Sequence, residues 1–305
     1  MVHVIDGYAV IILQVLAGVV VGTFGVLGKG ADGVLNRLAF TVLAPCLLYT
    51  VTFRADLGSI LSWAALVAVL SAGTCMAAFI VTARLCWGRP VRTATIPALA
   101  ASYTNASYIG IPVATYVLGN AAAVLPVLML QLLVITPLAL LTLDVRRQGD
   151  GSWGGLLVPL RNPLVLAILA GVVTSSLGWS PPAVVLAGLG EVGHAAVPVI
   201  LIAFGIALKN QRVFSPGTGR KDVLLAVVIK VVLMPAVALV VARYVLGLSG
   251  HAVLTVVLLA ALPTAQNVFN YADRYQADVV LARDAVLLTT LASLPVLLLL
   301  SVVLS

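Results

Sequence analysis

Charged side chains are scarce in this chain of 305 residues. Asp, Glu, Lys and Arg together make up 9% of it, whereas a soluble globular domain has about 25%. Cysteine and histidine are also rare, with three of each. Cys46, Cys75 and Cys86 fall in apolar stretches, without the pattern of a disulfide framework or of metal ligands. These shortages exclude an ordinary soluble domain, and we expect no metal site and no cofactor.

Apolar residues are abundant instead, at 62% of the chain, and they form long runs. A run of about 18 or more apolar residues can cross the hydrocarbon core of a bilayer as a helix. The sequence contains ten such runs, at 8–27, 33–53, 59–86, 93–119, 121–143, 163–179, 182–208, 223–247, 252–277 and 281–304. It therefore predicts an all-α polytopic membrane protein with ten transmembrane helices.

The distribution of Lys and Arg predicts how these helices are oriented. Fourteen of these residues lie in the loops that follow odd-numbered runs, and only Arg54 and Arg243 lie on the opposite side. Cytoplasmic loops carry the excess of positive charge, so both termini are expected outside. The net charge of +7 thus needs no nucleic acid as partner. Arg exceeds Lys and Ala is abundant, which suggests a bacterial source and the inner, plasma membrane.

The longest polar stretch, Asp144–Gly155, divides the chain into two blocks of five runs. We predict a first five-helix repeat at 1–143, a cytoplasmic loop at 144–162 and a second repeat at 163–305. Because five is odd, the second block enters the membrane from the opposite side. The two halves are therefore expected to form an inverted repeat.

Two of the runs are interrupted at their middle by polar residues, glycine and proline. The fourth run contains ASYTNASYIGIP (Ala101–Pro112), and the ninth contains ALPTAQNVFNY (Ala261–Tyr271). A helix breaks at membrane depth only where protein or a water-filled cavity satisfies the freed backbone groups. Matching breaks in two halves point to the binding site of a transporter. We assign the breaks to Gly110, Pro112, Pro263 and Val268.

The residues around these breaks resemble a known family. NASYIGIPVATYVLGN (Asn105–Asn120) and AALPTAQNVFNYADRYQAD (Ala260–Asp278) are similar to the fourth-helix and ninth-helix motifs of the auxin efflux carriers, and HAAVPVILIAFGIAL (His194–Leu208) and IKVVLMPAVALV (Ile229–Val240) to their seventh and eighth helices. The resemblance covers the whole chain. At Val268 the plant carriers have a second proline.

The resemblance implies two inverted repeats, in which helices 1, 2, 6 and 7 form a scaffold that usually dimerises. Helices 3–5 and 8–10 would form a transport domain. Its broken helices 4 and 9 would cross and hold the substrate, around Asn105–Pro112 and Gln266–Val268. The mechanism implied is of the elevator type, and the expected assembly is a homodimer.

Half-helix ends at a break suit a small carboxylate, because the free N–H groups at a helix N-terminus carry about half a positive charge. Asn105 and Asn267 could bind such a ligand, or they could only repair the broken backbone. Gln131 could contact substrate or form an interhelical hydrogen bond. The candidate substrate-binding residues are Thr104, Asn105, Tyr108, Pro112, Gln131, Thr264, Gln266, Asn267 and Asn270.

Four ionisable residues are candidates for coupling transport to protons or sodium. Lys230 lies deep in the eighth run. It could be a counter-charge for an anion, a titrating group linked to a gradient, or a side chain that snorkels to the interface. Glu191 and His194 lie three residues apart on one face of the seventh run. They could relay protons or form a hydrogen-bonded structural pair. Asp273 could ligate a coupling ion, or join Arg274, Arg283 and Asp284 in mutual ion pairs.

The sequence favours a secondary transporter of small organic anions, auxin-like or mono- and dicarboxylates such as malate or malonate. No ATP-binding motif is present, so a gradient would drive transport. A sodium-coupled symporter of the bile-acid type is the alternative, and it would need clustered acidic and amide oxygens. A membrane-embedded enzyme lacks support, because no Ser–His or paired acids face a plausible pocket. A receptor without transport would have no use for the breaks.

Overall fold

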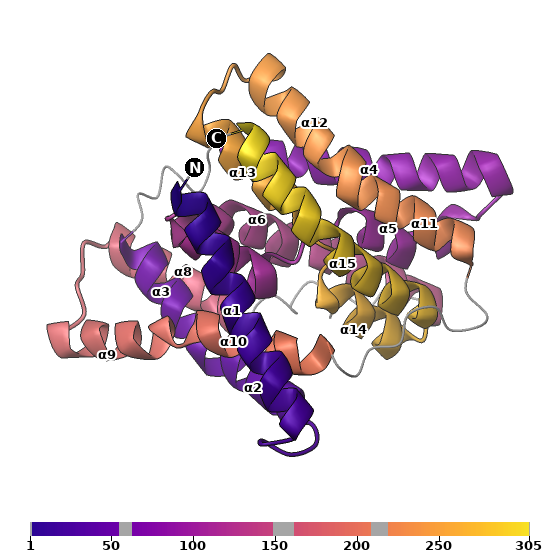
Figure 1. Cartoon of the computed structure of the whole chain (residues 1–305). Coiled ribbons are helices and arrows are strands. Elements are labelled where there is room, and N and C mark those ends of the chain that lie inside the picture. Colours follow the sequence, from indigo (N-terminus) through magenta and orange to yellow (C-terminus); the bar gives the residue numbers. More distant parts are fainter. Residues whose placement is uncertain (1, 55–62, 149–161, 209–218, 305) are drawn as a thin grey trace. The chain divides into compact units, whose positions relative to one another are not determined.

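The computed structural model describes residues 2–54, 63–148, 162–208 and 219–304, and the regular elements in these ranges are helical (Figure 1). The α-helices are α1 (Val2–Phe24), α2 (Ala31–Leu38), α3 (Ala44–Arg54), α4 (Trp63–Trp87), α5 (Thr95–Ser102), α6 (Leu125–Leu130), α7 (Thr136–Gln148), α8 (Pro163–Ser176), α9 (Ala183–His194), α10 (Ala196–Leu208), α11 (Arg220–Val228), α12 (Met234–Val240), α13 (His251–Ala261), α14 (Gln266–Tyr275) and α15 (Val279–Leu304).

Short π-helical and 3₁₀ segments join several of these helices into longer rods. The π-helical segments are η1 (Ala39–Leu43), η4 (Ala106–Gly110), η5 (Val113–Val117), η7 (Gln131–Ile135), η9 (Ile229–Leu233) and η10 (Val241–Val245), and the 3₁₀ segments are η3 (Val91–Thr93) and η6 (Ala121–Val124). π-helical turns are rare and often occur at functional sites. Here η4, η7 and η9 contain or adjoin predicted site residues.

Among the described residues, six of the helical rods are long and apolar enough to cross a membrane. They are Ala31–Arg54, Trp63–Trp87, Ala121–Leu143, Ala183–Ala207, Arg220–Val245 and Val279–Leu304. Shorter apolar helices occupy Ala9–Phe24, Ala106–Val117, Pro163–Ser176 and His251–Ala261. The chain is therefore an all-helical, multi-pass membrane protein. Each predicted run contains helix, while the ten crossings and their inverted repeat stay predictions.

The chain divides into two compact units that each combine segments from both sequence halves. Unit 1 comprises Met1–Leu61, Ile111–Leu125 and Val158–Gln211, and unit 2 comprises Ser62–Gly110, Pro126–Leu157 and Arg212–Ser305. The fourth run passes from unit 2 into unit 1 after Gly110. The predicted loop at 144–162 falls largely on 149–161, outside the described residues.

In unit 1, α1 crosses α10 at very short range (Figure 1). A Cβ atom on Gly18 would lie 2.2 Å from the Ile202 carbonyl oxygen, and one on Gly205 would lie 2.1 Å from the Val15 carbonyl oxygen. Small residues allow this approach of two backbones within the membrane. The glycine-lined side of α1 is thus used for packing inside the chain.

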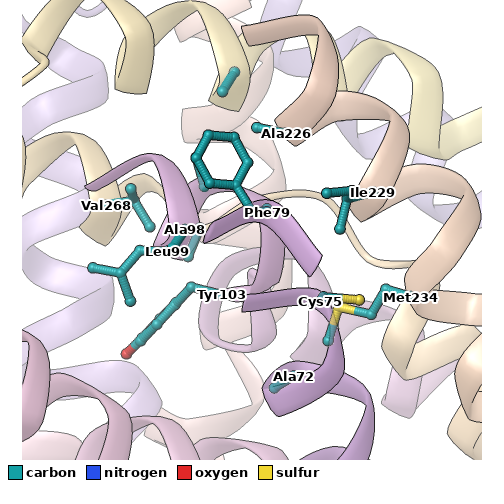
Figure 2. Packing of buried hydrophobic residues seen from close by; sticks show 14 of the residues in the cluster. Ala72, Cys75, Phe79, Ala98, Leu99, Tyr103, Ala226, Ile229, Met234 and Val268 are labelled. Atoms are coloured by element: carbon teal, nitrogen blue, oxygen red, sulfur yellow. The ribbon is translucent and has the colours of Figure 1, made fainter. Parts of the chain in front are cut away.

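In unit 2, α4, α5, α11, α12, α13 and α15 pack around a shared apolar core. Phe79 and Leu99 lie at its centre, and Cys75 lies next to Met234 (Figure 2). Two charged side chains of this unit, Lys230 and Asp284, are wholly buried, each with 0% exposure. The first interrupted segment belongs to unit 2 up to Gly110, and the second interrupted segment belongs to unit 2 throughout.

Candidate functional site

Three of the four residues to which the sequence assigned the breaks lie about one to two helical turns after them. In the fourth run, α5 ends at Ser102 and helical structure resumes at Ala106. In the ninth run, α13 ends at Ala261 and α14 begins at Gln266. The non-helical segments are therefore 103–105 and 262–265.

Gly110, Pro112 and Val268 are accordingly not break residues, and of the four assigned positions only Pro263 lies in a break. Gly110 donates its N–H to the Asn105 carbonyl at 2.9 Å, five residues back, in a π-helical turn. This register tolerates Pro112 directly afterwards, because a π turn already interrupts the regular hydrogen-bond ladder. Val268 lies in the first turn of α14, and its N–H binds the Ala265 carbonyl at 3.1 Å.

The structure brings the two breaks side by side in antiparallel orientation. The Asn105 N–H donates to the Pro263 carbonyl at 2.8 Å, and the Ala265 N–H donates to the Tyr103 carbonyl at 3.0 Å. Between these bonds, Thr104 and Thr264 form an isolated antiparallel β-bridge. Each break thus satisfies backbone groups that the other has freed, as membrane depth requires.

Side chains cap the carbonyl ends of the two interrupted helices. The Thr264 hydroxyl donates to the Ala100 carbonyl of α5 at 2.6 Å. The Thr264 N–H in turn donates to the Thr289 hydroxyl of α15 at 3.1 Å. Lys230 Nζ donates to the Ala260 carbonyl of α13 at 2.8 Å. Thr264 therefore has a backbone-repair role at the first break, whatever else it does.

Asn105 stands at the start of the second half of the fourth run and is 6% exposed. Its Oδ1 accepts the Tyr108 N–H at 3.1 Å, which is the bond of a helix N-cap. Because this bond uses the side-chain oxygen, the amide nitrogen remains as a donor for a ligand. Tyr108 itself is half-buried and Pro112 is buried.

A small cavity with a mostly apolar lining lies beside the first break, within unit 2. Its volume is about 20 Å³, and about 10–15 Å³ by this measure holds one water. Polar lining comes from Ser71 of α4, Ser102 of α5, Thr104 and Gln131, and the sulfur-bearing Met234 closes one side. Gln131 is 3% exposed and opens the π-helical segment η7. The cavity places Thr104 and Gln131 in one site.

The amides of the second break lie at the start of α14. Gln266 and Asn270 are exposed, and Asn267 is half-buried. The Asn267 side chain interacts with the Tyr103 hydroxyl, which also hydrogen-bonds the Thr136 hydroxyl at 2.8 Å. Tyr103 is 1% exposed, so this ring and its hydroxyl anchor Asn267 to the first break.

The remaining ionisable candidates, Glu191, His194 and Asp273, have exposed side chains. Glu191 and His194 are exposed on α9, and among the described residues no ion pair or hydrogen bond joins them. Asp273 is exposed near the end of α14. Of its predicted cluster, one ion pair forms, with Arg283 Nη2 at 2.8 Å from Asp284 Oδ1. Arg274 lies over the ring of Tyr275.

An ion-pair cluster that sequence reasoning missed joins three segments of unit 2. Arg89, after α4, pairs with Asp222 in the first turn of α11 and with Asp278 before α15, the latter at 2.8 Å. Trp87 donates its indole N–H to Asp222 at 3.0 Å. The sequence treated Arg89 only as one of the cytoplasmic charges. The available signal was that Asp222 and Asp278 each lie just before an apolar run, at the same membrane side as Arg89. Such acids could have been predicted to pair with the arginine.

Comparison with known proteins gives three related matches. Residues 156–301 match the model of a family described as membrane transport protein. A protein from Methanothermobacter thermautotrophicus named "Uncharacterized transporter" is 29% identical over 310 residues, which cover 96% of each chain. A protein from Rhizobium meliloti named "Putative malonate transporter" is 29% identical over 216 residues, which cover 67% of this chain and 65% of that protein.

Proposed function

Because the chain belongs to the membrane transport protein family, that of the auxin efflux carriers, we propose that this membrane transporter carries small organic anions by secondary transport. The chemical class we propose is mono- and dicarboxylates, with malonate as the first compound to test. Malonate is chosen because the name of the Rhizobium meliloti relative specifies it. In this proposal a membrane gradient, and not ATP, drives transport.

The observation that carries the proposal is the pairing of the two breaks at 103–105 and 262–265. The two breaks lie side by side, although they are far apart in the sequence. The helical segments that follow them, η4 and α14, therefore begin close to each other in unit 2. The half-helix that follows the second break is α14, and its first N–H groups have no partner within the helix. Those groups, with the amide donors of Asn105 and Asn267, favour a carboxylate over a cation.

The division of the chain into two units supports a moving transport domain. The paired breaks and the cavity at Gln131 belong to unit 2, so a bound anion would travel with that unit. Unit 1 contains α1, α3, α8, α9 and α10, which correspond to scaffold helices 1, 2, 6 and 7. We propose that unit 2 moves against a scaffold formed by unit 1, that the scaffold forms a homodimer, and that both termini lie outside.

Transport by the purified protein in proteoliposomes tests the function. Uptake of labelled malonate, malate, acetate and indole-3-acetate is measured against protein-free vesicles and against vesicles with excess unlabelled substrate. Saturable uptake of at least one carboxylate, competed by the unlabelled compound, is the expected result. Saturable uptake of organic cations or neutral sugars, with none of any carboxylate, would contradict the proposed substrate class.

The same vesicles separate the coupling hypotheses. Sodium-coupled transport of the bile-acid type requires uptake to rise with an inward sodium gradient. Carboxylates near a sodium site are its usual ligands, and among the described residues no group of three or more Asp, Glu, His or Cys side chains could hold a metal ion. The buried Asp284 of α15 offers a single oxygen, Oδ2, because its Oδ1 pairs with Arg283. We therefore propose that uptake is unchanged when choline replaces sodium and responds instead to a proton gradient or to the membrane potential.

A further inference from the structure

Lys230 is buried at membrane depth, where a lysine is energetically costly, and no acid among the described residues pairs with it. Its side chain is 0% exposed, so it does not reach out of the unit as a snorkelling lysine would. The three ion pairs among the described residues do not involve it. Insertion of Lys at the centre of a membrane helix is unfavourable. Something in unit 2 must offset that cost.

The contacts of the ammonium group identify what offsets it. Lys230 Nζ donates to the Ala260 carbonyl at 2.8 Å and lies 3.1 Å from Met234 Sδ. Ala260 is in the last turn of α13, which ends at Ala261. The last four carbonyls of a helix have no partner within the helix, and they carry the negative end of its dipole.

Lys230 replaces a particular backbone donor. In an uninterrupted helix the Ala260 carbonyl would accept the N–H of the residue four positions on, which is Thr264. Here the Thr264 N–H donates to the Thr289 hydroxyl instead. The break therefore frees the Ala260 carbonyl, and the ammonium group takes the place of the missing N–H.

The two breaks differ in the charge of their caps. At the first break the carbonyl of Ala100 is capped by the neutral hydroxyl of Thr264. At the second break the Ala260 carbonyl is capped by a cationic group. Ala260 and Met234, the two residues that Lys230 Nζ contacts, also line the small cavity to which Thr104 and Gln131 contribute polar groups. The positive charge thus stands directly behind the wall of the candidate site.

We propose that Lys230 is a positioning residue that holds the carbonyl end of α13 at the break and makes the adjacent site selective for anions. This inference rests on the proposed function only for its second half. The hydrogen-bond replacement at Ala260 is independent of what the protein transports. The two halves are tested by separate measurements.

The capping half is tested by hydrogen exchange in detergent. Lys230→Met removes the donor at similar volume, Lys230→Arg keeps donor and charge, and Lys221→Met applies the same change to an exposed lysine of α11. Loss of a charged hydrogen bond is expected to speed exchange of the last-turn amides of α13 roughly tenfold or more in Lys230→Met. Lys230→Arg and Lys221→Met should match the wild type. Unchanged exchange in Lys230→Met would overturn the capping assignment.

The charge half is tested by the KM values for malonate and acetate in proteoliposomes. Coulomb's law with an effective dielectric constant of about 20 gives roughly tenfold per carboxylate charge at about 10 Å. Lys230→Gln should therefore raise the KM for acetate about tenfold and that for malonate more, whereas a distorted site would lower the maximal rate for both alike.

Lys230→Arg should restore both KM values to within about twofold of the wild type. Equal KM values in Lys230→Gln and wild type, or failure of Lys230→Arg to restore them, would overturn the selectivity role. If the wild type transports neither anion, the proposed function fails, and hydrogen exchange still decides the capping assignment.

Discussion

Adding one methyl group at Gly205 should loosen unit 1, because α1 and α10 touch there through their backbones. The new Cβ of Gly205→Ala would lie 2.1 Å from the Val15 carbonyl oxygen and 2.9 Å from the Gly18 Cα. A backbone carbonyl cannot rotate away as a flexible side chain can, so the two helices must separate by about 1 Å. Overpacking of this kind costs up to about 3 kcal/mol, and the better helix propensity of alanine returns about 1 kcal/mol.

The net destabilisation of Gly205→Ala is therefore about 2 kcal/mol, which corresponds to a fall in Tm of about 3 °C at an unfolding entropy of about 2.1 cal/mol/K per residue. Thermal unfolding in detergent, followed by intrinsic fluorescence, measures it. Gly188→Ala is the matched control, since a Cβ on Gly188 of α9 has no atom within 4 Å. It should raise Tm slightly, by the propensity gain alone. A Gly205→Ala protein as stable as Gly188→Ala would refute the close backbone contact.

Three further outcomes follow from unit 2 and from the proposed transport. Arg89→Met removes the cation that pairs with Asp222 and Asp278 at partly buried positions. We expect it to lower the free energy of unfolding by about 1–3 kcal/mol, as measured by thermal unfolding. The control Arg84→Met, at an exposed position, should change that free energy by less than about 0.5 kcal/mol. Thr264→Val removes the hydroxyl that caps Ala100 at equal volume, and it should cost about 1–3 kcal/mol and slow malonate uptake, with normal uptake as the contrary result. Replacing sodium by choline should leave malonate uptake unchanged, and a large loss would favour the bile-acid type of symporter.

Composition and periodicity predicted much of the fold because membrane helices are specified by few variables. The length of an apolar run gives its helix, and each of the ten runs contains helix, although several helices extend past their run, as α1 does from Val2 and α7 to Gln148. Loop charge predicts topology by the same kind of reasoning, although no bilayer tests it here. The paired breaks were also visible, since glycine, proline and amides are rare at membrane depth.

The details of the breaks were not predictable from single residues. Gly110 and Pro112 look like breakers, yet π-helical turns absorb them, and that choice depends on the neighbouring break. Pro263 lies in the non-helical segment between α13 and α14, where a residue with a fixed backbone angle and no N–H donor fits. Val268 was assigned by comparison with a proline elsewhere, and a valine in the first turn of a helix has no reason to interrupt it.

The long-range partners of buried polar groups could not be predicted from the sequence, for a different reason. Which carbonyl receives the ammonium group of Lys230 depends on how α11, η9 and α13 pack, and pattern alone carries no such information. The same is true of Arg89, whose two acidic partners lie 133 and 189 residues away. A sequence shows that a buried charge needs a partner, and only the fold identifies it.

The most direct test of the central claim, that the paired breaks bind the transported anion, is malonate uptake by Asn105→Asp. Aspartate keeps the oxygen that caps the Tyr108 N–H, so the half-helix should remain intact. It replaces the amide donor by a negative oxygen, which at about 5 Å from a carboxylate is worth at least about a hundredfold in affinity. Asn120→Asp is the matched control, because Asn120 caps the Ala122 N–H at 3.0 Å in the same way but lies in unit 1. The account predicts that uptake is lost in Asn105→Asp and kept in Asn120→Asp, with Tm unchanged in both. Normal uptake by a folded Asn105→Asp protein would contradict it.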